Sequence, residues 1–377
     1  MAINKLFNAF RFRNGMSMLL FLCFALSGFS FFDTARGETA EPHAGVYPTD
    51  QSFLHILPTV DQGKYALTLR LIDFDGNRRQ NEFLLDSSSS HGTKAYPGLL
   101  FGWLDENGNT LNREGESIAR LFDGAQEVNH LFLLDPLKTA GVWEFDSTQC
   151  FASLHGDSFA LYRELGTIES GNTSLDHGQF LPFNDLKEGV LSSYHPVNLT
   201  DAKDEPLPDD APRKGEPLYA IPANEANHYF GLTLDAVFTF PSSGTDDLGE
   251  DLIAYFTADD DLWVYIDGYL ILDLGGIHSA VPGTINFSTG AVTYRGADGK
   301  DYTTKLYKLF RQRYEEKYPD ARERDVQSFM NEIFTENSHW QTVFRGNTTH
   351  TLKLIYLERG AGASNLTIRF NLPVLEK

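Results

Sequence analysis

Three consecutive aspartates, Asp259, Asp260 and Asp261, stand just before a strand-like apolar run and are the residues of this chain best suited to chemistry. Carboxylates this close repel one another, and their charge costs free energy unless a cation compensates for it. Hard carboxylate oxygens, without Cys or His among them, favour Ca²⁺ over Zn²⁺. The alternative is an exposed loop whose charges face water, and spacing alone does not decide between the two.

The dipeptide Asp267-Gly268 predicts a β-hairpin, because it separates two apolar runs, 262–266 and 269–274. Both faces of the hairpin are apolar, which indicates a central position in its sheet and not an edge. Asp267 should lie roughly 20 Å from Asp260, at about 3.3 Å per residue, and is therefore a turn residue and a poor ligand. One face is expected to hold Trp263, Tyr265, Leu270 and Leu272, and the other Leu262, Val264, Ile266 and Ile271.

The two-residue loop also fixes the register of this hairpin. It places Leu262 opposite Asp273 and Asp260 opposite Gly275. The loop after the second strand is therefore expected beside the three aspartates. Its candidate ligand-contacting residues are Gly275, Gly276 and His278. The alternative for His278 is a hydrogen-bonded loop histidine with no ligand.

Two segments around these residues resemble the fibro-slime domain, a family of surface and secreted proteins related to the PA14 β-sandwich. They are TADDDLWVYIDGYLILDLGGIH (257–278) and LERGAGASNLTIRFNLP (357–373). The resemblance continues upstream in GVWEFDSTQCFASL (141–154), GQFLPFND (178–185) and NHYFGLTLDAVFTFP (227–241). It implies a mainly β chain folded as a PA14-like antiparallel β-sandwich, a fold in which carbohydrate binding is common.

The same resemblance implies a ligand set for Ca²⁺. Adhesin members hold the ion with two adjacent aspartates joined by a cis peptide, and an Asn and carbonyls from a late loop complete the site. Asp261 stands where PA14 modules usually have glycine. The expected metal ligands are Asp259, Asp260 and Asn365, and the expected ligand-binding residues are Asp261, Gly275, Gly276, His278, Gly360 and Gly362.

Four further residues near these motifs have expected structural roles. Glu358 and Arg359 are expected to form an ion pair. Trp263 and Tyr265 have side chains that can stack on sugar, but their place on a strand makes them core residues first.

The elements that position these residues are mostly strands, because apolar and polar residues alternate at 65–72, 229–240 and 366–372. A helical insertion is predicted near 304–345, with one helix over 304–318. The second helix is indicated by the spacing of Val326, Phe329, Met330, Ile333 and Phe334. Asp320 and Glu323 are expected to form a capping box at its start.

The chain begins with an export signal, which predicts a secreted or cell-surface protein. A basic flank precedes the uncharged apolar run 16–32, and Ala35-Arg36-Gly37 supplies a small-residue cleavage site, so 1–37 is a signal peptide. The alternative is an uncleaved membrane anchor. No later stretch is long and apolar enough to span a bilayer, so the mature chain is not expected to insert into a membrane.

Four regions are expected along the chain. After the signal peptide, 38–60 is predicted to be a tether, 61–200 an N-terminal β-rich region and 218–377 the sandwich core. The Pro-rich acidic stretch 199–217 between the last two is predicted to be an exposed loop or a linker.

Composition excludes several classes of protein. The chain has 377 residues, 31 Lys and Arg against 52 Asp and Glu, and a net charge of −21. This acidity argues against a nucleic-acid partner. Removal of the signal leaves Cys150 as the one cysteine, so no internal disulfide and no Cys-based metal site are expected, and Cys150 should be a small buried residue.

The leading functional reading is a non-catalytic module that binds glycans or polysaccharide through Ca²⁺. One alternative is a structural matrix or surface-layer component in which an ion only stabilises the fold. Another is a glycoside hydrolase that uses a carboxylate pair such as Asp260 and Glu358. The sequence contains no Gly-x-Ser-x-Gly, His-Glu-x-x-His or phosphate-loop motif that would favour another enzyme class.

Overall fold

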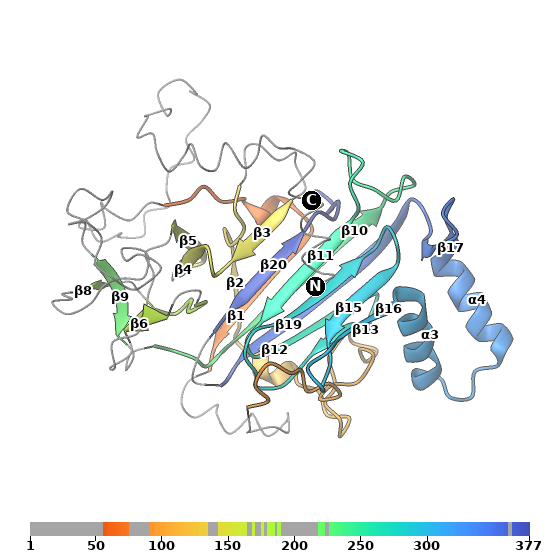
Figure 1. The fold of residues 1–377 in the computed structure, drawn as a ribbon, viewed down its shortest axis with the longest axis horizontal. Helices are drawn as coiled ribbons and strands as arrows, with labels where there is room; N and C mark the ends of the chain where they lie inside the picture. The colour runs from red at the N-terminus through yellow and green to blue at the C-terminus, as the bar shows by residue number, and fades with distance from the viewer. Residues whose placement is uncertain are drawn as a thin grey trace. The chain divides into compact units, whose positions relative to one another are not determined.

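Two six-stranded antiparallel sheets dominate the computed structural model (Figure 1). The model describes residues 56–74, 90–134, 142–163, 168–169, 175–176, 179–184, 187–189, 218–222, 226–360 and 364–377. All of them belong to one compact unit, residues 48–377. The predicted signal peptide, the stretch 199–217 and Gly362 lie outside the described residues.

The first sheet runs in the order β13-β12-β19-β10-β1-β2. Its strands are β13 (Tyr269–Leu274), β12 (Asp261–Ile266), β19 (Thr348–Glu358), β10 (Phe230–Phe240), β1 (Leu67–Asp73) and β2 (Gln126–Val128). The second sheet runs β16-β15-β14-β11-β20-β3. Its strands are β16 (Asp301–Lys305), β15 (Ala291–Arg295), β14 (Val281–Asn286), β11 (Ile253–Ala258), β20 (Leu366–Phe370) and β3 (Trp143–Asp146).

The core lies between these two sheets. Phe238 of β10 meets Phe287, next to β14, with ring centroids 5.5 Å apart. A Cβ built on Gly283 of β14 would lie 2.5 Å from Leu272 of β13, so the facing strands approach closely at that glycine. The prediction of a mainly β, antiparallel sandwich is confirmed.

Smaller elements complete the described part of the chain. They are the pair β4 (Cys150–His155) and β5 (Ser158–Arg163), the pair β17 (Phe334–Glu336) and β18 (Thr342–Phe344), the strands β6 (Ile168–Glu169), β7 (Leu175–Asp176), β8 (Lys187–Gly189) and β9 (Leu218–Pro222), and the 3₁₀ turns η1 (Gln62–Lys64) and η3 (Ala119–Phe122). Cys150 is buried, as predicted, and burial raises the pKa of its thiol to about 12.

The helical insertion is confirmed as α3 (Leu306–Lys317) and α4 (Glu323–Ile333), beside the β13 and β16 ends of the sheets (Figure 1). Phe310 of α3 packs on Tyr269 of β13. The predicted capping box is wrong. Arg322 is the N-cap, and the Asp325 carboxylate accepts its backbone N–H at 3.3 Å, because Tyr318 to Ala321 form a separate turn.

In the described part of the chain no helix is long and apolar enough to cross a membrane.

The central hairpin is present, but its predicted register holds only at the turn. The pairs Ile266–Tyr269 and Tyr265–Leu270 are as predicted, whereas a bulge between Val264 and Tyr265 shifts the pairs beyond it by one residue, so that Leu262 faces Leu274 and not Asp273. The extra residue turns Leu272 to the opposite face, against the second sheet.

The predicted central position of the hairpin is correct for β12 and wrong for β13, which ends its sheet. Its apolar residues are nevertheless buried, because other elements cover that edge. Leu270 donates its N–H to the Gly102 carbonyl at 2.9 Å, Trp103 bridges to Tyr269, and α3 packs alongside.

The two predicted regions 61–200 and 218–377 share their sheets. β1 pairs with β10, and β3 pairs with β20. The predicted tether also ends earlier than residue 60, because Ile56 bridges to Tyr162 and Thr59 to Leu133. Both sheets therefore need strands from the first half of the chain.

Candidate metal centre

The three aspartates are buried where the chain passes from β11 in one sheet to β12 in the other. Asp259 is 7% exposed, Asp260 1% and Asp261 0%. This burial rules out the alternative of a solvated loop. The peptide bond between Asp259 and Asp260 is cis, as the PA14 resemblance implies.

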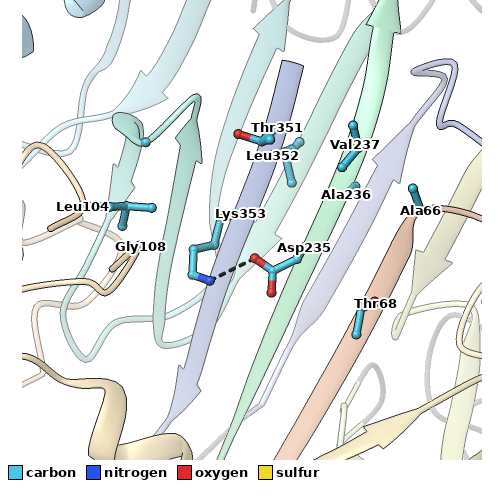
Figure 2. Close-up of a pocket in the computed structure, with 11 residues that line it drawn as sticks. Ala66, Thr68, Leu104, Gly108, Asp235, Ala236, Val237, Thr351, Leu352 and Lys353 are labelled. Carbon is cyan, nitrogen blue, oxygen red and sulfur yellow. Dashed lines mark hydrogen bonds and ion pairs between the residues drawn. The ribbon is translucent and has the colours of Figure 1, made fainter. Parts of the chain in front are cut away.

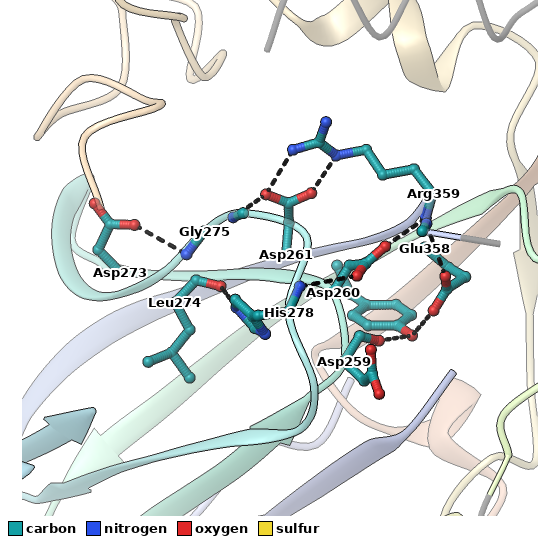
Figure 3. A network of polar contacts seen from close by, with 12 residues as sticks. Asp259, Asp260, Asp261, Asp273, Leu274, Gly275, His278, Glu358 and Arg359 are labelled. Atoms are coloured by element: carbon teal, nitrogen blue, oxygen red, sulfur yellow. Dashed lines mark hydrogen bonds and ion pairs between the residues drawn. The ribbon is translucent and has the colours of Figure 1, made fainter. Parts of the chain in front are cut away.

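Alternate backbone N–H groups of the loop after β13 donate to the three carboxylates, and Figure 3 shows the contacts of Asp260 and Asp261. Gly276 donates to Asp261 Oδ1 at 2.5 Å, and His278 donates to Asp260 Oδ1 at 3.2 Å. The Ala280 N–H is a hydrogen-bond partner of Asp259. The sequence correctly placed this loop beside the aspartates, although the bulge brings Gly276 and not Gly275 to the nearest carboxylate.

Asp261 is neutralised by Arg359. The Nε atom of this buried arginine lies 2.5 Å from Asp261 Oδ2, and its Nη2 atom lies 3.2 Å from Oδ1 (Figure 3). The expected Glu358–Arg359 ion pair is therefore wrong, because Arg359 turns to a carboxylate on another strand. The guanidinium balances the charge of Asp261 through this bidentate contact, so the predicted role of Asp261 in binding a ligand has no support.

Asp259, Asp260 and Glu358 have no cationic side-chain partner in the described part of the chain. Among the described residues, no Lys or Arg side-chain nitrogen lies within 4.0 Å of these three carboxylates. Burial raises the pKa of Asp259 to about 6. Burial and then the neighbouring Asp261 raise the pKa of Asp260 to about 7. Burial, and then Asp260 and Asp259, raise the pKa of Glu358 well above its usual range.

The described ends of the late loop, residues 360–365, lie against Asp259 and Asp260, as predicted, and these two aspartates are called the acidic pair below. Asn365 accepts the Asp259 N–H on its carbonyl at 2.9 Å, and its Nδ2 atom lies 3.4 Å from Asp259 Oδ2. A Cβ on Gly360 would lie 2.7 Å from Asp260 Oδ2, so only glycine allows the backbone this close to the carboxylate. Gly362 lies outside the described residues.

A buried hydroxyl network behind the pair was missed by sequence reasoning. The Tyr356 hydroxyl lies 2.7 Å from the Asp259 carbonyl, 3.1 Å from Glu358 Oε2 and 3.1 Å from Ser364 Oγ. Tyr356 precedes Glu358 by two residues on β19, so the two share a strand face, and that spacing was the available signal.

The other expectations divide clearly. His278 is 1% exposed, with Nε2 2.9 Å from the Leu274 carbonyl and Nδ1 3.1 Å from the Ser279 carbonyl, which is the hydrogen-bonded loop role. Burial lowers the pKa of its imidazole. Trp263 and Tyr265 are fully buried core residues and do not reach a surface ligand. Asp267 is the turn residue predicted, and it accepts the Thr351 N–H at 2.8 Å.

The donor set fits a hard cation only if amide and carbonyl oxygens take part. In the described part of the chain, no three His, Cys, Asp or Glu side chains converge as a metal-binding group. Asp259 and Asp260 supply two carboxylates, and the side-chain amide of Asn365 lies 3.4 Å from Asp259 Oδ2. Oxygen ligands of mixed type are what Ca²⁺ accepts, whereas Zn²⁺ sites use Cys and His.

A shallow groove of about 440 Å³ lies elsewhere, on the outer face of the first sheet (Figure 2). Asp235, Thr351 and Lys353 are among its lining residues, and Lys353 Nζ lies 2.9 Å from Asp235 Oδ1. None of the predicted site residues lines it, so the groove and the acidic centre are separate features.

Comparison with known proteins gives partial matches. No family model and no solved structure matches the chain. Protein psiI of Dictyostelium discoideum is 35% identical over 81 residues, 22% of this chain and 10% of psiI. Protein psiP is 32% identical over 109 residues, 27% of this chain and 13% of psiP. Protein psiC is 31% identical over 144 residues, 37% of this chain and 22% of psiC. Proteins psiP and psiC come from the same organism as psiI. The chain thus spans under a quarter of these relatives' length, and the fibro-slime resemblance stays a prediction.

Proposed function

We propose that the chain is a secreted or cell-surface, non-catalytic module that binds carbohydrate through Ca²⁺. One observation carries the proposal: Asp259 and Asp260 are adjacent, buried and without a cationic side chain within 4.0 Å among the described residues. Buried like charges are costly unless they are protonated or meet a cation. The guanidinium of Arg359 pairs with Asp261 and not with Asp259 or Asp260.

Calcium would be held by the carboxylates of Asp259 and Asp260 and by the amide of Asn365, and backbone carbonyls would complete the shell. The ion would supply positive charge to this acidic site and vacant coordination positions for sugar hydroxyls. Residues of the chain itself already fix the orientation of one of these carboxylates. Backbone N–H groups of His278 and Arg359 orient the two oxygens of Asp260, at 3.2 and 3.0 Å.

Calorimetric titration with Ca²⁺ tests the first half of the proposal, and a glycan array with and without chelator tests the second. Wild type should bind calcium, and Asp260→Asn should not. Asp235→Asn is the matched control, because Asp235 lies on the outer sheet face in ion pairs with Arg70 and Lys353. It should bind calcium and glycans as the wild type does. Glycan binding that survives chelation would contradict the proposal.

A structural ion is the second candidate, and the burial of the site favours it. A cation between side chains that are 7% and 1% exposed has little room for sugar hydroxyls in the described part of the site. This candidate predicts that calcium raises the melting temperature of wild type but not of Asp260→Asn, and that no glycan binds with or without calcium.

The hydrolase alternative has less support from the geometry. A glycosidase pair must reach a sugar from an open cleft, whereas Asp260 and Glu358 are 1% and 0% exposed. Turnover of a glycan by calcium-free protein, lost in Asp260→Asn, would favour it over both binding proposals.

A further inference from the structure

The late loop that carries Asn365 is held by a segment from the first half of the chain. Ser364, which is fully buried, makes three hydrogen bonds to residues 179–180. Its N–H donates to Gln179 Oε1 at 2.6 Å, and its hydroxyl donates to the Phe180 carbonyl at 2.6 Å. The Phe180 N–H donates in return to the Ser364 carbonyl. A side chain 185 positions away thus fixes the residue before Asn365.

The 179–184 segment is itself anchored in the core. The Phe180 ring packs on Phe145 and Phe230, with centroids 5.2 and 5.5 Å away. The Pro182 carbonyl accepts the Leu154 N–H at 3.0 Å. Gln179 is 6% exposed, so its amide is presented to Ser364 from a rigid base.

Ser364 is connected to Asp259 of the acidic pair by two sets of contacts. Its hydroxyl lies 3.1 Å from the Tyr356 hydroxyl, which in turn lies 2.7 Å from the Asp259 carbonyl. The next residue, Asn365, accepts the Asp259 N–H at 2.9 Å. A displacement of Ser364 therefore moves both the amide and the backbone beside Asp259.

We propose that Gln179 is a positioning residue of the cation centre: by accepting the Ser364 N–H, it fixes the loop that presents Asn365 to Asp259. This inference rests on the proposed calcium site. It assigns a role to the GQFLPFND segment, which neither the calcium ligands nor the sandwich topology explain. The cation centre would then depend on residues from both halves of the chain.

The test compares three variants of the full chain by calcium titration and by hydrogen exchange of the calcium-free protein. Gln179→Met keeps the volume and removes the acceptor, and Gln179→Glu keeps an acceptor oxygen. Gln62→Met is the control, because buried Gln62 donates to the Val128 carbonyl at 3.2 Å, away from the centre. Gln179→Met should weaken calcium binding about tenfold, the effect of one lost buried hydrogen bond. It should also speed amide exchange at 364–366.

Gln179→Glu should retain binding within about threefold of wild type, and Gln62→Met should lower the melting temperature without changing calcium affinity. Equal calcium affinity in Gln179→Met and wild type, with unchanged exchange at 364–366, would overturn the role of Gln179 alone. Failure of wild type to bind calcium would overturn the calcium site and this inference together. If Gln179→Met does not fold, loss of affinity in Gln179→Glu beyond tenfold would count against the inference, because the acceptor is still present.

Discussion

At the scale of single residues, the acidic centre is defined by which carboxylates have a partner. Asp261 shares two hydrogen bonds with Arg359, whereas Glu358 meets only hydroxyl and backbone groups in the described residues. A neutral Glu358 satisfies its contacts, because a protonated Oε2 can donate to the Tyr356 hydroxyl while Oε1 accepts the Gly360 N–H at 3.2 Å. Glu358 thus differs from the proposed ligands in needing no cation.

This difference gives a prediction for two isosteric substitutions. In Glu358→Gln the new amide can make the same contacts, so melting temperature and calcium affinity should stay close to those of wild type. In Asp260→Asn one of the two backbone donors, His278 or Arg359, loses its acceptor and a ligand oxygen disappears, so calcium binding should be abolished. Calorimetry and thermal melts measure both. Loss of calcium binding in Glu358→Gln would show that Glu358 is a ligand after all.

The raised pKa values of Asp259 and Asp260 predict how stability depends on pH. Both pKa values lie above the ordinary value of 3.8, at about 6 for Asp259 and about 7 for Asp260. At a pH between 3.8 and these raised values, the folded state holds protons that the unfolded state has released. The protons held by Asp259 and Asp260 should therefore make the free energy of unfolding of calcium-free protein fall as pH rises from about 4 to about 7. Protons compete with the cation, so calcium should stabilise the fold more at pH 8 than at pH 5. Denaturant melts at both pH values, with calcium or chelator, measure the difference, and equal stabilisation at both would contradict it.

At the scale of elements, the 275–280 loop is held in place by a second segment, residues 91–96, which hydrogen-bonds to its backbone. His91 donates its N–H to the Ile277 carbonyl at 2.7 Å, and Tyr96 donates to the Gly275 carbonyl at 2.6 Å. Gly276 has φ +104°, and a Cβ there would lie 2.6 Å from the Tyr96 Cβ. The loop is therefore held between this segment on one side and the three carboxylates on the other.

Gly276→Ala should therefore lower both melting temperature and calcium affinity. Gly98→Ala is the matched control, because Gly98 also has positive φ, +89°, but a Cβ there meets nothing within 4 Å. The control carries only the backbone strain, roughly 1–2 kcal/mol, and should keep calcium affinity. Thermal melts and calcium titration of the two variants separate strain from collision. Equal affinity loss in both would mean that contact with Tyr96 does not matter.

Prediction from sequence succeeded for elements whose pattern is local. Alternation located β1, β10 and β20, and the Asp-Gly turn located the β12–β13 hairpin. The bulge at Val264 and Tyr265 was missed, because apolar residues on both faces leave no alternation that marks a register. The Arg359–Asp261 and Gln179–Ser364 contacts were also missed, since they join residues 98 and 185 positions apart and depend on how strands cross between sheets. For the same reason Glu358 was paired with its sequence neighbour.

At the scale of the whole molecule, the first half of the chain is part of both sheets and of the supports of the acidic centre. β1 supplies seven paired positions to β10, and β3 closes the second sheet against β20. The core residues Leu99, Leu100 and Leu121 cover Trp263 and Tyr265 on the outer face of the first sheet. Without them the fragment 218–377 would expose this apolar face and the free edges of β10 and β20.

The fragment 218–377, expressed alone, should therefore fail to fold cooperatively, whereas 48–377, which contains every described residue, should melt as the full chain does. Circular dichroism and calorimetric melts measure this, and calcium binding should follow folding. A cooperative melt of 218–377 with calcium affinity equal to that of 48–377 would show that the centre needs neither residues 90–98 nor Gln179. The first half would then have no part in the site, and the role of Gln179 would fail without any loss to the calcium proposal itself.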